Sequence, residues 1–331
     1  MAETVRLKDI ADELGLSVVT VSNALSGKKG VSDAVRQEIR KKASELGYKI
    51  DKGAAERFHI GVVVSEKHLK VEASFYWALY QKVVFAAAQK RSTTMIEILD
   101  AKVNEKSELP QILSDRSVDG LLVIGRIERR YLKKMLQAAT VPVVFLDFCD
   151  DDLPCDAVLS NNYLGMYRST RYLLERGHRD IMFLGTVTVN NNIMDRYFGF
   201  RKAMEEWGIR AVGDYILEHR NAWTGEFEVW LPKRMPTAFA CASDFAASYL
   251  YDKLVAEGYR VPEDVSLVGY DNYLYGHVLA GQITTYNVGM ERMAEAAVEL
   301  LVKRIGGCCG RRNEIRYIDG EIVERSSVKP L

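Results

Sequence analysis

From residue 60 onward the sequence alternates short apolar runs with amphipathic stretches, and this alternation limits the possible folds more than any other feature. Continuous apolar runs are typical of strands buried on both faces, which need helical crossovers between them. Strands are expected at residues 60–64, 94–99, 120–124, 141–146, 180–185, 237–242 and 265–270. Helices are expected near residues 75–90, 106–116, 128–138, 163–176, 193–207, 244–257 and 289–305. The pattern predicts a two-lobed parallel α/β region with a ligand cleft at the carboxyl ends of the strands.

The first 49 residues follow a helical pattern instead. Residues 7–14 carry apolar side chains at helical spacing and end at Gly15, and residues 18–25 form a second such helix with Ser17 as its cap. A third amphipathic helix follows Ser32. Two short helices joined by a glycine-containing turn predict a helix-turn-helix. On periodicity alone, the three helices could equally form a small protein-binding bundle.

Charge, cysteine count and hydropathy restrict the class of protein further. The 45 lysines and arginines balance the 45 acidic residues, so any nucleic-acid contact must be local. The five cysteines are odd in number and lack metal-type spacing, so we expect free thiols, no metal and no cofactor. No apolar run approaches the roughly 18 residues of a membrane span, and the N-terminus lacks an apolar signal segment. We therefore expect a cytoplasmic protein that does not contact a membrane.

Residues 5–48 resemble the DNA-binding head of the lactose and galactose repressor family (LacI/GalR type). They match the family signature Ala-x-x-x-Gly-Val-Ser-x-x-Thr-Val-Ser at residues 11–22, with Leu16 at the Val position. Basic residues that would suit a phosphate-binding surface crowd the third helix and the segment before it: Lys28, Lys29, Arg36, Arg40, Lys41 and Lys42. The resemblance implies that residues 18–25 enter the major groove of DNA.

The same resemblance places Val18, Val19 and Asn23 against base edges. The two valines cannot donate hydrogen bonds and can read only apolar features such as a thymine methyl, while Asn23, where many relatives have Arg, suits adenine. Phosphate contacts are expected from the polar residues around them, although Ser22 could equally act in capping. The complete set of expected DNA contacts is Lys8, Ser17, Val18, Val19, Thr20, Ser22, Asn23, Lys28 and Arg57.

The linker departs from the family pattern. In the family a hinge helix inserts a Leu from each subunit between base pairs in the minor groove. Residues 49–59 are shorter than the usual hinge, lack its Pro-Asn start and carry Arg57 near the position of that Leu. The sequence therefore argues against a Leu wedge. Arg57 could instead enter a narrow minor groove or remain an exposed linker charge.

The rest of the chain is similar to the effector domain of the same family, which resembles type I periplasmic sugar-binding proteins. The matching segments are residues 175–185, 194–200, 236–244, 258–272 and 283–288. The resemblance weakens at residues 220–234, where the family has a helix but FEVWL alternates like a strand. The expected parts are a helix-turn-helix domain (1–49), a linker (50–58) and an effector-binding and dimerisation domain (59–331), with lobes formed by 59–160 plus 288–314 and by 161–287 plus 315–331.

Effector-binding residues follow from the matching motifs. Phe75 and Tyr76 match an aromatic pair that packs against a ligand ring, and Arg196 offers a planar fork for vicinal hydroxyls or a carboxylate. The complete expected set is Phe75, Tyr76, Asp150, Asn161, Arg196, Trp223, Ser243, Asp244 and Asp271. Each has a structural alternative, because aromatics can pack in the core, aspartates can cap helices and an arginine can form a surface ion pair.

The resemblance implies an effector-controlled repressor that acts as a homodimer on a pseudo-palindromic DNA operator. A carbohydrate effector is expected, with a nucleobase or other small metabolite as the alternative. The sequence lacks the P-loop, His-Glu-x-x-His and Gly-x-Ser-x-Gly motifs, so no catalytic residue is predicted. A sugar-processing enzyme, detectable by product formation, is the alternative from another class. A transport component would need a signal peptide and no DNA-binding head.

Overall fold

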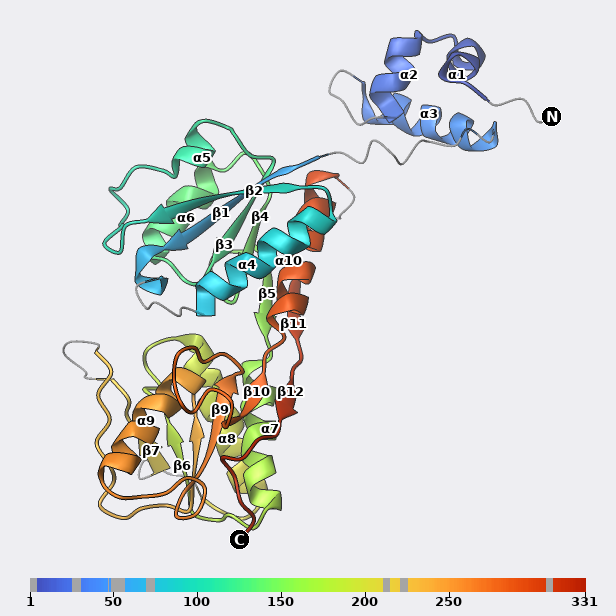
Figure 1. Ribbon diagram of the computed structural model, residues 1–331. Coiled ribbons are helices and arrows are strands. Elements are labelled where there is room, and N and C mark those ends of the chain that lie inside the picture. The colour runs from blue at the N-terminus through green and yellow to red at the C-terminus, as the bar shows by residue number, and fades with distance from the viewer. Residues whose placement is uncertain are drawn as a thin grey trace.

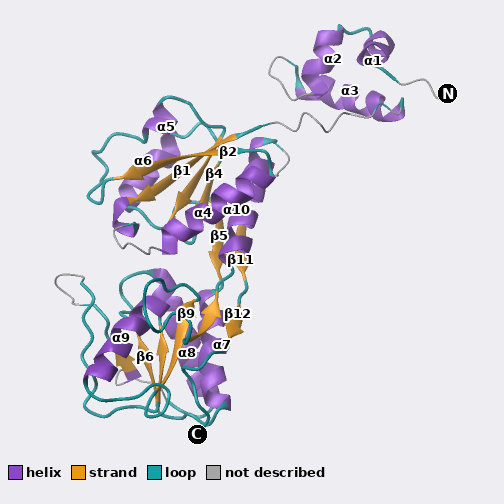
Figure 2. Cartoon of the chain, in the orientation of Figure 1, coloured by secondary structure: helices purple, strands orange, loops and turns teal. Residues whose placement is uncertain are grey.

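The computed structural model describes residues 5–25, 31–46, 48, 57–69, 75–210, 215–220, 226–307 and 312–331. It contains a three-helix N-terminal unit and two α/β lobes that lie end to end (Figure 1). Figure 2 shows that helices flank the strands in both lobes, whereas the N-terminal unit contains helices and loops. No helix in these ranges is both long and apolar enough to cross a membrane.

The N-terminal unit consists of α1 (Leu7–Leu14), α2 (Val18–Leu25) and α3 (Asp33–Glu45). Gly15 ends α1 in the left-handed conformation, with φ of 62°, which glycine adopts without a Cβ clash. The small core consists of Ile10, Ala11, Val21, Ala24, Ile39 and Ala43, all buried. The predicted helical head is confirmed.

The first lobe is built on a parallel sheet with the strand order β11-β5-β4-β3-β1-β2. Its strands are β1 (His59–Ser65), β2 (Thr93–Leu99), β3 (Gly120–Ile124), β4 (Val143–Leu146), β5 (Asp156–Ser160) and β11 (Ile315–Ile318). One face packs against α4 (Phe75–Gln89) and α10 (Met290–Ile305). The other packs against α5 (Gln111–Ser114) and α6 (Arg129–Ala138). A single 3-10 turn, η2 (Glu66–His68), follows β1.

The second lobe repeats this design with the strand order β12-β10-β9-β8-β6-β7. Its strands are β6 (Ile181–Leu184), β7 (Ile216–Leu217), β8 (Ala238–Cys241), β9 (Ser266–Asp271), β10 (Thr284–Asn287) and β12 (Glu321–Val323), of which β12 is antiparallel to β10. The helices α7 (Asn162–Glu175) and α8 (Asn191–Glu206) cover one face, and α9 (Asp244–Ala256) covers the other. α7 and α8 pack so closely that a Cβ on Gly199 would lie 2.1 Å from the Tyr163 carbonyl oxygen.

The chain crosses between the lobes after β5, after β10 and after β11. The third crossing lies later than the predicted boundary after residue 314, because Ile315–Ile318 pairs with β5 of the first lobe before the chain enters β12. Three strands that abut these crossings, β5, β10 and β11, were not expected. Each has few consecutive apolar residues and becomes a strand through its neighbours in the sheet.

Two other expectations differ from the structure. The helix expected at 106–116 is reduced to Gln111–Ser114, because Pro110 favours the start of a helix and disrupts its interior. The strand-like FEVWL segment forms no strand among the described residues. Its one pairing is an isolated bridge between Phe227 and Arg220.

Candidate functional site

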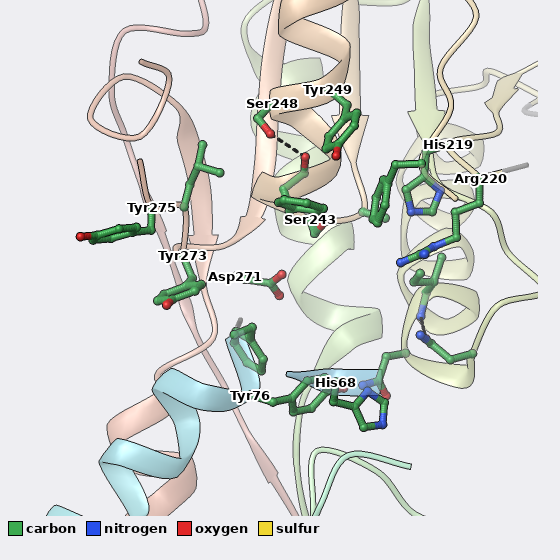
Figure 3. Close-up of a pocket in the computed structure, with 18 of the residues that line it drawn as sticks. His68, Tyr76, His219, Arg220, Ser243, Ser248, Tyr249, Asp271, Tyr273 and Tyr275 are labelled. Carbon is green, nitrogen blue, oxygen red and sulfur yellow. Dashed lines mark hydrogen bonds between the residues drawn. The ribbon is translucent and has the colours of Figure 1, made fainter. Parts of the chain in front are cut away.

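A cavity of about 480 Å³ lies between the two lobes. Its lining comes from segments at or after the ends of β1, β4, β7, β8 and β9, and from the helices α4, α8 and α9. Figure 3 shows side chains from these segments around one common space. The cavity is therefore at the carboxyl ends of the strands, where open α/β sheets bind ligands.

Arg196 is the buried centre of the polar part of this cavity. Arg196, on α8, is 7% exposed, and its guanidinium lies over the Tyr270 ring, 3.9 Å from the centroid. Nε donates to Asn162 Oδ1 at 2.8 Å, and Nη1 donates to the Ala242 carbonyl oxygen. Nη2 lies 3.2 Å from Asp271 Oδ1. These contacts hold the planar fork in one orientation.

Asp147, directly after β4, joins the two lobes. Its backbone is in the left-handed region, with φ of 68°. Tyr76 Oη of the first lobe donates to Asp147 Oδ2 at 3.1 Å, and Asn192 Nδ2 of the second lobe donates to the same atom at 3.1 Å. Burial raises the pKa of Asp147 to about 6, while Arg196, Tyr76 and Asn192 favour the carboxylate. Asp147 is thus a polar bridge across the cavity that the sequence analysis missed.

The carboxylates of the second lobe have different roles. Asp271 ends β9 with φ of 98° and faces Arg196, and burial raises its pKa while Arg196 opposes that rise. Asp244 is fully buried and accepts from Thr285 Oγ1 at 2.7 Å and from the Tyr273 backbone N–H at 2.9 Å. Burial raises the pKa of Asp244 to about 8. Asp244 therefore fixes the loop after β9 and does not line the cavity.

Five residues of the predicted set line the cavity: Phe75, Tyr76, Arg196, Ser243 and Asp271. Ser243 also caps α9, because its Oγ accepts from the Ala246 N–H at 3.0 Å.

Two other predicted residues are engaged away from the cavity. Asn161 caps α7 by accepting from the Leu164 N–H and donates to Asp319 Oδ1. Asp150 binds Arg126 at 3.0 Å and Arg129 at 2.9 Å. Trp223 lies outside the described residues.

Further residues that line the cavity were not predicted. Aromatic side chains form much of it, namely Phe227, Phe245, Tyr249, Tyr273 and Tyr275. Figure 3 shows Tyr273 and Tyr275 on one side and His219 and Arg220 on the opposite side. His219 and Arg220 lie two and three residues after β7, a strand of two residues that is too short to show a strand pattern in the sequence. No signal in the sequence distinguishes this strand end from an ordinary loop.

The N-terminal unit presents a second candidate surface on α2. Val18 is 43% exposed and Val19 is 68% exposed, although both are apolar. Ser17 caps the helix, because its Oγ accepts from the Thr20 N–H at 3.0 Å. Lys8 and Arg57 are exposed, and Ser22 and Asn23 are partly buried. Lys28 lies outside the described residues.

The described residues hold no group of three His, Cys, Asp or Glu side chains arranged to bind a metal ion. Cys149, Cys155 and Cys241 are free thiols. Burial raises the pKa of all three, so each thiol is a poor nucleophile. Cys308 and Cys309 lie outside the described part of the chain.

Two known families match segments of the chain. The family described as bacterial regulatory proteins, lacI family, matches residues 6–51. The family described as periplasmic binding protein-like domain matches residues 170–328.

Individual relatives match nearly the whole chain. The HTH-type transcriptional repressor PurR of Vibrio atlanticus (strain LGP32) is 28% identical over 98% of this chain and 99% of its own length. Among solved structures, the transcriptional regulator CelR in complex with cellobiose is 23% identical, with a TM-score of 0.66 over 98% of this chain and 99% of CelR. The lac repressor dimer bound to operator and the anti-inducer ONPF is 19% identical, with a TM-score of 0.65 over 99% of this chain and the whole repressor chain.

Proposed function

The chain belongs to the LacI family of bacterial regulatory proteins, and from this premise we propose that it is an effector-controlled repressor that binds specific DNA sequences. The observation that carries the proposal is the combination of two sites in one chain. A three-helix head exposes apolar side chains on its second helix, and a cavity between two lobes gathers buried polar groups. A catalytic sugar-processing enzyme would not need the head.

The head supports DNA reading through α2. Val18 and Val19 are neighbouring exposed apolar side chains on a short surface helix, and this arrangement suits an apolar contact with a thymine methyl. Asn23 would pair with adenine from the same helix. The cap made by Ser17 fixes the start of α2 and so sets the position of both valines.

The cavity supports effector control because its polar network crosses the lobes. Tyr76 and Asp147 belong to the first lobe, whereas Asn192 and Arg196 belong to the second. A ligand that displaces or extends these contacts changes the relative stability of open and closed lobes. The head responds because ligand binding and DNA binding then favour different lobe arrangements.

The repressor would act as a homodimer in the cytoplasm, with two heads on one pseudo-palindromic operator. For the effector we propose a carbohydrate, because aromatic faces beside an Arg and Asp network suit the apolar and hydroxyl faces of a sugar. The PurR repressors among its relatives favour a nucleobase as the second candidate. The same aromatic side chains could stack on a planar base.

The proposal is tested by selecting genomic DNA fragments with the purified full-length protein at moderate salt. We expect a palindromic motif, and we expect a variant with Val18 and Val19 both changed to Lys to lose that motif while retaining weak sequence-independent binding. The matched control is Arg234→Gln, which removes an exposed charge in the second lobe and should retain the motif. The proposal would be contradicted if the wild-type protein enriched no DNA sequence motif.

A further inference from the structure

Aromatic side chains line the interlobe cavity in two groups. The first, which we call the cross-lobe aromatic group, consists of Phe75, Tyr76 and Tyr273. The Phe75 ring meets Tyr76 edge to face with centroids 5.5 Å apart, and it meets Tyr273 in the same way at 6.3 Å. Phe75 and Tyr76 begin α4 in the first lobe, whereas Tyr273 follows β9 in the second. This group therefore lies where the two lobes face each other.

The second group, which we call the α9 aromatic group, belongs to the second lobe alone. It consists of Phe227, Phe245 and Tyr249. Phe245 and Tyr249 lie four residues apart on α9, so both side chains project from the same face of the helix. The Phe227 ring stacks on Tyr249 with centroids 5.1 Å apart and meets Phe245 edge to face at 4.8 Å. The three rings thus form one apolar surface at the cavity.

The polar residues of the cavity lie between these two groups. Figure 3 shows Asp271 between Tyr76, at one end of the cavity, and Tyr249, at the other. Asp271 pairs with the buried Arg196, and Asp147 accepts from Tyr76. We call Arg196, Asp147 and Asp271 the polar centre. The cavity therefore has a polar centre with aromatic side chains on both sides of it.

A buried hydrogen-bond donor accompanies the α9 aromatic group. His219 is 1% exposed, lines the cavity and meets the Phe227 ring edge to face with centroids 5.2 Å apart. The Thr186 backbone N–H donates to His219 Nδ1 at 2.8 Å, so the neutral ring carries its proton on Nε2. Burial and the positive charge of Arg220 lower the pKa of His219 to about 3, which keeps the ring neutral. Within the part of the chain that the structure describes, Nε2 has no hydrogen-bond partner.

The α9 aromatic group and His219 together suit a sugar ring. The aromatic faces can pack on the apolar C–H face of such a ring, and the His219 Nε2–H can donate to one of its oxygens. The Tyr249 hydroxyl, which also lacks a hydrogen-bond partner among the described residues, can donate or accept. A wholly apolar group at this position would leave the buried N–H of His219 without an acceptor, which is unfavourable.

We propose that the cavity binds a disaccharide, with one sugar ring at the polar centre and the second ring against the α9 aromatic group and His219. The inference rests on the proposed effector-binding function of this cavity and names the class of effector. A single sugar at the polar centre would leave the His219 N–H without an acceptor and the α9 rings uncovered. The cavity volume of about 480 Å³ is in the range of sites that enclose ligands larger than one sugar ring.

The test is isothermal titration calorimetry on the full-length protein with glucose, galactose, mannose and xylose. Each is compared with disaccharides that contain it in α and in β linkage, and with adenosine, guanosine, cytidine and uridine. We expect at least one disaccharide to bind about tenfold or more tightly than either of its component sugars, since burial of a second ring contributes on the order of this factor. The proposal is overturned if no disaccharide binds more tightly than its components, or if a nucleoside binds more tightly than every disaccharide.

Variants of Tyr249 test the position of the second ring. Tyr249→Ala should remove most of the advantage of the disaccharide and leave binding of the sugar at the polar centre unchanged, whereas Tyr249→Phe keeps the aromatic ring and should retain most of that advantage. The matched control is Tyr163→Ala, which removes a tyrosine of similar exposure from α7 in the same lobe, outside the cavity lining, and should retain all of it. Circular dichroism and the melting temperature without ligand establish that each variant is folded.

Equal loss in Tyr249→Ala and Tyr163→Ala would overturn the proposed position of the second ring. A single sugar that binds as tightly as every disaccharide would overturn the inference and leave effector binding by the cavity intact. DNA-fragment selection by the same protein is independent of these titrations. Failure of the disaccharide site is therefore distinguishable from failure of the repressor function.

Discussion

The N-terminal head and the interlobe cavity place their functional side chains in opposite environments. The head exposes Val18 and Val19 on a unit with a small apolar core, whereas the cavity buries Arg196 with Asp271 in a lobe with an extensive core. Substitution of an exposed apolar side chain changes the unfolding free energy little, whereas removal of one partner of a buried ion pair lowers it strongly. DNA preference can therefore diverge with little effect on folding, while effector binding is coupled to the stability of the lobes.

The largest expected loss of stability comes from a substitution in the cavity. Arg196→Ala removes the partner of Asp271 and the donors to Asn162 and the Ala242 carbonyl, and leaves a carboxylate buried without its ion pair. We expect a loss of about 3–5 kcal/mol in unfolding free energy, measured by urea denaturation of the full chain. Arg201→Ala on the same helix removes an exposed pair with Glu205 and should change it by less than about 1 kcal/mol. Equal effects of the two variants would contradict this account.

The next effect tests the independence of the head. Ile39 is fully buried in the head core, and Ile39→Ala should cost about 2–5 kcal/mol there, which a three-helix unit tolerates poorly. Operator binding, measured by fluorescence anisotropy, should be lost while the melting transition of the two lobes stays unchanged. Ile39→Val should cost only about 0.5–1.5 kcal/mol and retain binding. A shift of the lobe transition with Ile39→Ala would show that the two regions fold as one unit.

The third prediction concerns pH. The pKa of Asp147 is about 6 in the folded chain and about 3.9 when unfolded, so protonation favours the folded state. Its contribution is fully present below about pH 4 and is lost as the pH rises through about 6, a change of about 3 kcal/mol.

Urea denaturation at pH 4.5 and pH 7.5 measures this difference. Wild-type protein should lose more stability over that interval than Asp147→Asn, which cannot titrate. The exposed cavity-rim variant Asp252→Asn should behave like wild type. Parallel curves for wild type and Asp147→Asn would refute the assignment of this pH dependence to Asp147.

A substitution at the exposed surface of the head should have the smallest effect on stability but should still change DNA recognition. Val19→Ala should change the unfolding free energy by no more than about 0.5 kcal/mol, because Val19 is 68% exposed. It should weaken base preference at one position of each half-site by on the order of 1 kcal/mol. Val19→Ile retains an apolar contact and should keep the preference. Fragment selection that returns one unchanged motif for all three proteins would show that Val19 does not face a base.

The same comparison explains how far the sequence predicts the structure. The helices of the head are determined by residues close in sequence, because capping residues and Gly15 set where they begin and end. The cavity is specified by strand ends that meet only after folding. The motif predicts that Asp150, four residues after β4, binds the effector. The residue that faces the cavity is instead Asp147, the first residue after the strand, where the backbone turns in the left-handed conformation.

Neighbouring polar residues also exchange roles in ways that a motif does not resolve. Asn161 caps α7, while the next residue, Asn162, accepts from Arg196. Asp244 was expected to meet the effector, yet its bonds to Thr285 and the Tyr273 backbone place it beneath the cavity wall. Predicting these roles needs the direction of each side chain, which depends on packing between the lobes.

The central claim is that the cavity and the head are coupled, and hydrogen exchange of the full-length protein with operator DNA tests it without a known effector. Because coupling between two sites is reciprocal, operator binding must change the cavity if the cavity controls operator binding. We predict altered exchange at the backbone amides of residues 190–196 and 271–275 with the selected operator, but not with a scrambled duplex. Protection confined to the head, with unchanged exchange around the cavity, would contradict the account.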